Sequence, residues 1–120
     1  MKKEEKAPNF LDFIPEPLRK AETDGEGIVT VYVPRFGSGR LGRILTRIFR
    51  SKDITVRLDS VGSFVWNRCD GHRSLFSIGT EMKESFGEEV EPVFDRLVLF
   101  IRQMERGKLI HVRNREPLQE

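Results

Sequence analysis

The sequence predicts an α+β fold in which a three-stranded antiparallel sheet precedes three short helices. Apolar and polar residues alternate along residues 28–33 and 54–58, which is the two-residue period of a strand with one buried face. Further along, apolar residues recur every three or four positions, and Asp70-Gly71 and Gly87 interrupt them as helix ends do. Strands followed by helices indicate a sheet on one side of a three-helix bundle. Such short helices joined by tight turns are also typical of a winged helix.

Three segments are expected to pair in the sheet. Residues 18–23 form a short edge strand, and turn residues follow it at 24–27. Residues 28–33 form a strong strand, and residues 54–58 form the other. The alternation of that last strand directs three side chains to the core: Ile54, Val56 and Leu58.

The first 16 residues are expected to form an irregular N-terminal arm. Three prolines lie in or beside it, and proline is excluded from helix and sheet interiors: Pro8, Pro15 and Pro17. Four apolar residues dock the arm onto the domain: Phe10, Leu11, Phe13 and Ile14. The domain itself is expected over residues 17–113, with a C-terminal tail at 114–120.

Capping residues and glycines delimit three helices, which are expected at about 59–71, 74–87 and 88–107. The first opens at Asp59 or Ser60, the second is capped by Ser74, and the third has Pro92 in its first turn. Trp66 and Phe94 fall on apolar helical faces, so both are expected in the core. A short strand is expected at 108–112.

An additional amphipathic helix is expected at 41–50, between the two strongest strands. Its apolar residues have helical spacing: Leu41, Ile44, Leu45, Ile48 and Phe49. Its other face carries Arg43, Arg47 and Arg50, which we assign to partner binding. Three alternatives stay open for this face: a solvated surface over the core, contact with an anionic membrane, and docking to an acidic partner.

Composition and charge limit the function classes. The chain has 120 residues, a net charge of +2 and one cysteine, so it cannot form an internal disulfide. No signal peptide is visible, and the longest apolar run, 97–101, is far too short to span a membrane. These features predict a cytoplasmic protein with no membrane span.

The sequence offers little catalytic chemistry. Cys69, His72 and His111 are the only soft metal ligands, whereas a zinc site needs three or four. Gly37, Gly39 and Gly42 do not have the spacing of a phosphate-binding loop. We therefore expect no enzyme activity, no catalytic residue, no metal and no cofactor.

Nucleic-acid binding is also not expected. In a helix-turn-helix the later helix enters the major groove. Here the third helix starts with the acidic residues Glu88, Glu89 and Glu91, with Asp95 one turn on. These charges repel phosphates.

The segment Leu58-Asp59-Ser60-Val61-Gly62-Ser63-Phe64-Val65-Trp66, followed by Asp70-Gly71 and then Ser74 to Ile78, carries a family resemblance. The closing segment 100–109 adds to it. Together they resemble the PqqD family of small peptide chaperones, named for pyrroloquinoline quinone biosynthesis. The likeness covers residues 54–112.

The resemblance implies a peptide-binding role. Such domains recognise the leader region of ribosomally made precursor peptides and present it to a modifying enzyme, often a radical SAM enzyme. The leader adds as a strand beside the last sheet strand and packs against the third helix. Mapped onto this chain, the peptide-binding residues are Ile54, Thr55, Val56 and Arg57 of the strand and Val93, Arg96, Phe100 and Gln103 of the helix flank.

Two alternatives from other classes remain. One is a winged helix-turn-helix regulator that binds DNA. The other is a structural protein that forms a homodimer through its edge strand.

Overall fold

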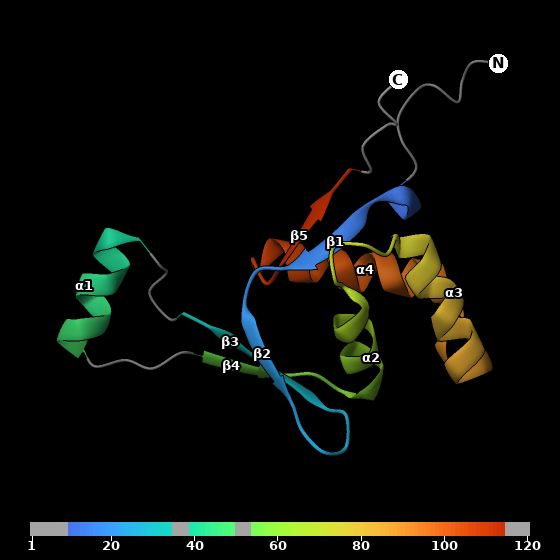
Figure 1. Cartoon of the computed structure of the whole chain (residues 1–120), viewed down its shortest axis with the longest axis horizontal. Helices are drawn as coiled ribbons and strands as arrows, with labels where there is room; N and C mark the ends of the chain where they lie inside the picture. The colour runs from blue at the N-terminus through green and yellow to red at the C-terminus, as the bar shows by residue number, and fades with distance from the viewer. Residues whose placement is uncertain (1–9, 35–38, 50–53, 115–120) are drawn as a thin grey trace, which may run out of the picture. The chain divides into compact units, whose positions relative to one another are not determined.

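The computed structural model describes residues 10–34, 39–49 and 54–114 (Figure 1). The chain divides into two compact units, one formed by residues 19–63 and the other by residues 1–18 together with 64–120. The division falls inside helix α2 (Ser60–Arg68).

The unit of residues 19–63 contains the predicted three-stranded antiparallel sheet. Its strands are β2 (Lys20–Thr23), β3 (Val29–Val33) and β4 (Ile54–Arg57), in the spatial order β2-β3-β4. Val31 of the central strand lies opposite Ala21 on one side and Val56 on the other. The predicted sheet and its strand order along the chain are confirmed.

The two faces of this sheet differ in polarity. Val29 and Val31 are fully buried on one face. On the other face the hydroxyl of Tyr32 donates to Glu22 Oε1 at 2.9 Å. This is the pattern of an antiparallel sheet with one solvated face.

The expectation that Ile54 faces a closed core is wrong. Its side chain shares the apolar face with Val56 and Leu58, but Ile54 is 48% exposed, whereas Leu58 is 8% exposed. The reason is its register, because Ile54 lies opposite Val33, which is itself only half-buried. Burial therefore declines toward this end of the β3–β4 pair.

A tight turn joins β2 to β3. Asp24 Oδ1 accepts hydrogen bonds from the backbone N–H groups of Ile28 and Glu26. These bonds hold the pKa of the Asp24 carboxyl below its usual range. Gly27 has a φ of +86°, a left-handed conformation that glycine adopts without strain.

The junction between β4 and α2 closes the sheet. The Leu58 N–H donates to Val29 O at 2.9 Å, while the Val29 N–H donates to Ser63 Oγ at 2.8 Å. Ser63 is 1% exposed, and its hydroxyl also contacts Leu58 O at 3.4 Å. Asp59 Oδ1 accepts from the Gly62 N–H at 2.7 Å, which caps the first turn of α2.

Helix α1 (Arg40–Phe49) lies between β3 and β4 in the chain, within one residue of its predicted bounds. Arg40, Leu41, Arg43, Ile44 and Arg47 all have exposed side chains. Arg50, the third arginine assigned to partner binding, lies outside the described residues.

The other unit is mainly helical. It contains the end of α2, helix α3 (Leu75–Phe86), the 3-10 helix η3 (Gly87–Val90) and helix α4 (Val93–Arg106). Fully buried aliphatic residues of α3 and α4 form its core: Leu75, Ile78, Leu97 and Ile101. The Ser74 hydroxyl accepts from the Ser77 N–H at 3.1 Å and caps α3 as predicted.

The two aromatic residues expected in the core differ. Trp66 is 7% exposed, so its place in the core is confirmed. Phe94 is only half-buried and stacks on the exposed Phe76, with ring centroids 5.7 Å apart. A Cβ on Gly79 would collide with the Phe94 ring, so the missing side chain of Gly79 makes room for that ring.

The described part of the N-terminal arm, residues 10–16, is not irregular, which corrects the prediction. After the 3-10 helix η2 (Phe10–Asp12), residues Ile14–Pro17 form strand β1. This strand pairs antiparallel with the C-terminal strand β5 (Ile110–Arg113), beside which it runs in Figure 1. The predicted docking of the arm is confirmed, since Ile14 is 8% exposed and the Leu75 N–H donates to Phe13 O at 3.0 Å.

The position of the prolines explains why β1 tolerates them. The Leu18 N–H donates to Leu109 O, so even-numbered residues direct their backbone groups toward the β5 side. Odd-numbered residues face the other way, where Pro15 O accepts from the Gly71 N–H at 2.9 Å. The N–H groups that Pro15 and Pro17 lack would therefore point away from β5, so the ladder between β1 and β5 loses no hydrogen bond.

We predict that Ser63→Ala destabilises the protein by about 1–3 kcal/mol, because the buried Val29 N–H loses its acceptor. Urea unfolding followed by circular dichroism measures the change. Ser85→Ala removes an exposed hydroxyl from α3 and is the matched control, expected to change the free energy of unfolding little. Equal effects of the two substitutions would contradict the role given to Ser63.

Candidate functional site

The outer edge of β4 is the first part of the predicted site. Among the described residues β4 pairs with β3 on one side and with no strand on the other. Because the Leu58 N–H points to β3, the alternation of an antiparallel ladder turns the backbone groups of Thr55 and Arg57 outward. The edge thus presents the N–H and C=O groups of these two residues.

The side chains of β4 add contacts on both faces of that edge. Ile54 provides exposed apolar surface on one face, and Val56 is half-buried. Arg57 lies on the other face, with its guanidinium 4.0 Å from Asp24 Oδ2 and its side chain 67% exposed. An ion pair this exposed contributes little, so Arg57 can exchange Asp24 for an acidic group of a ligand.

The residues predicted on α4 have different environments. Arg96 and Gln103 are exposed, and Phe100 between them is half-buried, as a helix flank requires. Val93 is 2% exposed, so its predicted place on that flank is wrong and it belongs to the core. At 100° per residue, Val93 lies on the same side of the helix as the buried Leu97 and Met104. The apolar pattern alone did not distinguish this buried side from the neighbouring flank.

The strand and the helix belong to different units, since β4 lies within residues 19–63 and α4 does not. Their combination in one site therefore stays a prediction.

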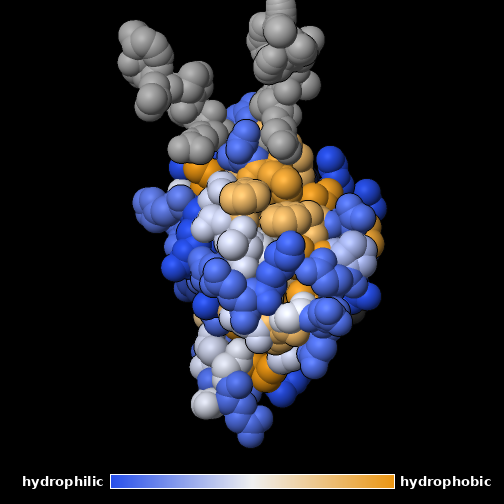
Figure 2. Space-filling model, turned by 90° about the vertical axis from the view of Figure 1, so that its right-hand side faces the viewer, coloured by the Kyte–Doolittle hydropathy of each residue, from blue (hydrophilic) through white to orange (hydrophobic). Residues whose placement is uncertain are grey.

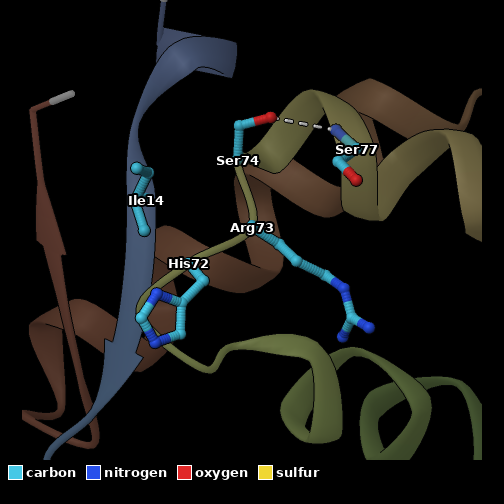
Figure 3. A pocket seen from close by; sticks show the side chains of 5 residues that line it. All are labelled: Ile14, His72, Arg73, Ser74 and Ser77. Carbon is cyan, nitrogen blue, oxygen red and sulfur yellow. Dashed lines mark hydrogen bonds between the residues drawn. The ribbon is translucent and has the colours of Figure 1, made fainter.

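A shallow cavity of about 260 Å³ lies in the helical unit and was not predicted (Figure 3). It is lined by Ile14, His72, Arg73, Ser74 and Ser77. The sequence pattern did not indicate this cavity, because Ile14 lines it from β1, and the segment that forms β1 was expected to be irregular.

The polar groups around this cavity serve the local structure. The Ser74 hydroxyl caps α3, as the dashed line in Figure 3 shows. Arg73 forms ion pairs with Asp70 and with Glu81, each at 3.5 Å. Burial acts to raise the pKa of Asp70, but hydrogen bonds from the His72 and Arg73 N–H groups outweigh it, and the pKa is lowered. The Asp70 carboxylate therefore stabilises the loop.

The Asp70-Gly71 turn connects this loop to both strands of the small sheet. Gly71 has a φ of +84°, and its N–H donates to Pro15 O. Its carbonyl accepts from Arg113 Nη2 at 2.9 Å. The turn is therefore a structural element held by β1 and β5.

Cys69 and His72 do not form a reactive pair. Cys69 is 2% exposed, and this burial, together with the nearby Asp70 charge, raises the pKa of its thiol to about 12. His72 is exposed. In the described part of the chain, no group of three or more His, Cys, Asp or Glu side chains is placed to hold a metal ion.

The segment that leads into α4 is acidic, but the predicted start of the third helix at Glu88 is wrong, because residues 87–90 form η3 and α4 begins at Val93. Glu88 and Glu89 in η3 and Asp95 in α4 are exposed. Glu91 lies 3.9 Å from Lys83 Nζ. A surface of this charge is unfavourable for contact with phosphates.

Apolar surface is also exposed on the side of the helical unit that carries α3. Figure 2 shows apolar side chains gathered in one area of this face, with hydrophilic side chains around them. Phe76, 55% exposed and stacked on Phe94, is an exposed apolar residue of α3. This surface is not part of the predicted site.

Comparison with protein families identifies the family of this chain. The family described as Coenzyme PQQ synthesis protein D (PqqD) matches residues 48–110, more than half of the chain. The chain belongs to the PqqD family. No curated protein and no solved structure matches it significantly.

The match confirms the resemblance seen in the sequence. It covers β4, α2, α3 and α4, whereas β2, β3 and most of α1 precede it. The motif residues have structural roles: Asp59 and Ser63 organise the start of α2, and Gly71 joins β1 and β5. In this member of the PqqD family the motif therefore identifies the framework.

We predict that Cys69 reacts with thiol reagents only when the protein unfolds. Burial raises the pKa of its thiol to about 12, whereas the pKa of an unfolded cysteine is near 9.0. Labelling at mildly alkaline pH, with and without denaturant and followed by mass spectrometry, measures this difference. Rapid labelling of the native protein would show that the thiol is accessible.

Proposed function

We propose that this chain is a peptide-binding adaptor that holds the leader region of a ribosomally made precursor peptide and presents it to a modifying enzyme. The leader adds as a strand along the outer edge of β4. A radical SAM enzyme is the proposed class of partner. The adaptor itself carries out no reaction. Its single buried cysteine supports a reducing, cytoplasmic location.

The outer edge of β4 is the observation that carries this proposal. The N–H and C=O groups of Thr55 and Arg57 point away from β3. An extended peptide can pair with such groups through its own main chain, which gives affinity with little dependence on sequence. Membership of the PqqD family supports a role of this kind.

Side chains beside the edge supply selectivity. The exposed Ile54 can contact an apolar leader residue, while Arg57 can pair with an acidic residue on the opposite face of the added strand. Neighbouring residues of an extended peptide point to opposite faces. The favoured client segment therefore alternates apolar and acidic residues.

The two alternative functions are less well supported. DNA binding is disfavoured by the exposed Glu88 and Glu89 before α4. Self-pairing of two copies through β4 would use the same edge as the leader. A dimer that the leader dissociates would favour the adaptor, and a dimer that the leader leaves intact would favour self-pairing.

We predict that Thr55→Pro abolishes leader binding while the fold is retained. Proline removes the outward N–H of Thr55 but no donor of the β3 ladder, so it is tolerated at an edge position. Calorimetric titration with synthetic leader peptides, taken from precursor genes beside this one, measures affinity. Thr55→Ala keeps the N–H and is expected to bind like the parent.

A second control addresses the other edge of the sheet. Ala21 lies opposite Val31, in a pair whose backbone groups point away from each other, so Ala21→Pro blocks the outer edge of β2. This variant is expected to bind the leader normally. Loss of binding in Ala21→Pro but not in Thr55→Pro would move the site to β2. Binding by both proline variants would reject strand addition.

We predict that Phe100→Asp weakens leader binding about tenfold or more, since a carboxylate that the peptide covers without a partner is costly. Leu99→Asp is the matched control, because Leu99 is 60% exposed and lies away from the flank of Phe100. Similar affinities for the two variants would remove α4 from the site and leave the β4 edge as the contact surface.

A further inference from the structure

Helix α1 has an apolar face and a basic face that the proposed peptide site does not use. At 100° per residue its five apolar positions cover an arc of about 140°. Arg40, Arg43 and Arg47 lie on the opposite side of the helix. Among the described side chains of the apolar face, Leu41 is 67% exposed and Ile44 is 48% exposed. This helix therefore presents apolar surface and positive charge together.

The charge of the surrounding segment has one sign. Residues 35–52 include six basic residues and no acidic one. The described arginines of α1 are all exposed. A partner of this helix must therefore be negative over the whole width of the basic face, and it must also accept aliphatic side chains beside that charge.

An anionic lipid surface meets both requirements. Aliphatic side chains enter the boundary between headgroups and acyl chains, while long arginine side chains reach the phosphates. The helix is about 15 Å long, half the thickness of the hydrocarbon core. It can therefore lie in the plane of a bilayer surface. Among the described residues, no helix has the length and apolar character needed to cross a membrane.

We propose that α1 is an interfacial helix that binds the protein to an anionic lipid bilayer, with Leu41 and Ile44 inserted and Arg40, Arg43 and Arg47 at the headgroups. This role is independent of peptide binding by β4. The adaptor can hold a leader peptide with or without the membrane contact.

A second copy of the chain is a less suitable partner for α1. Six of the chain's 19 acidic residues lie in segment 81–95, and two of these six, Glu81 and Glu91, already have partners. Glu81 pairs with Arg68 at 2.7 Å and with Arg73, and Glu91 pairs with Lys83. Binding α1 there would require these contacts to be exchanged.

Vesicle flotation of the full chain tests the proposal. The probes are vesicles of phosphatidylcholine alone and of phosphatidylcholine mixed with phosphatidylglycerol. The parent protein is expected to float with the mixed vesicles only, and less at high salt, because screening weakens the attraction. Absence of the parent from the mixed vesicles at low salt would overturn the proposal.

Two double variants separate the faces of the helix. Leu41→Glu with Ile44→Glu, and Arg43→Glu with Arg47→Glu, are each expected to reduce the bound fraction about tenfold or more. Leu41→Ile with Ile44→Leu keeps the apolar face, and this double variant is expected to bind the mixed vesicles like the parent. Leu99→Glu places the same charge on an exposed leucine of α4 and is expected to leave vesicle binding unchanged.

Other outcomes identify a different partner. If only the arginine variant loses binding, α1 recognises negative charge without insertion, and the proposal fails. If sedimentation velocity shows a dimer that Leu41→Glu with Ile44→Glu dissociates, and the parent does not bind vesicles, the partner is a second copy. Leader titration of the same variants is expected to match the parent, so failure here leaves the peptide-binding proposal intact.

Discussion

The hydrogen bond from the Val29 N–H to the Ser63 hydroxyl organises the unit of residues 19–63. Val29 is fully buried, so its N–H cannot be left to water. The β3–β4 ladder ends with the hydrogen bond from the Leu58 N–H to Val29 O. The bond to Ser63 then supplies the acceptor for the Val29 N–H. A short side chain on the first turn of α2 therefore completes the sheet and fixes the point at which strand gives way to helix. The position of the C-terminal end of β4 follows from this bond.

The same geometric rule explains one closed edge and one open edge. In β1 the odd-numbered residues face away from β5, and prolines occupy two of those positions beside the Asp70-Gly71 turn. In β4 the outward positions are Thr55 and Arg57, which keep their N–H groups. Proline and a covering loop are two ways in which proteins block an edge. Strand β4 uses neither among the described residues, which is why we assign the ligand to it.

The family motif and the proposed recognition surface are made of different residues. Asp59, Ser63 and Gly71 are engaged by backbone groups of the framework. Ile54 and Arg57 lie beside the edge, where one is half exposed and the other is in a weak ion pair. The framework contacts constrain the backbone geometry of this unit, whereas Ile54 and Arg57 take no part in them. Under the proposed function, these two side chains can therefore be replaced to suit another peptide without loss of the framework contacts.

The sequence by itself determined the elements whose periodicity is strong. The alternation in 28–33 and 54–58, the caps at Asp59 and Ser74 and the helix-ending Gly87 all have local physical causes, and the structure has them where they were predicted. Only the tertiary structure decided that Ile14–Pro17 is a strand. Proline is acceptable in a strand only when its missing N–H would face away from the ladder. That orientation depends on the partner strand β5, which is about a hundred residues away in the sequence. It also decided that Val93 is buried and Ile54 exposed. Periodicity gives the face on which a side chain lies, but how far that face is covered depends on contacts between elements that are distant in sequence.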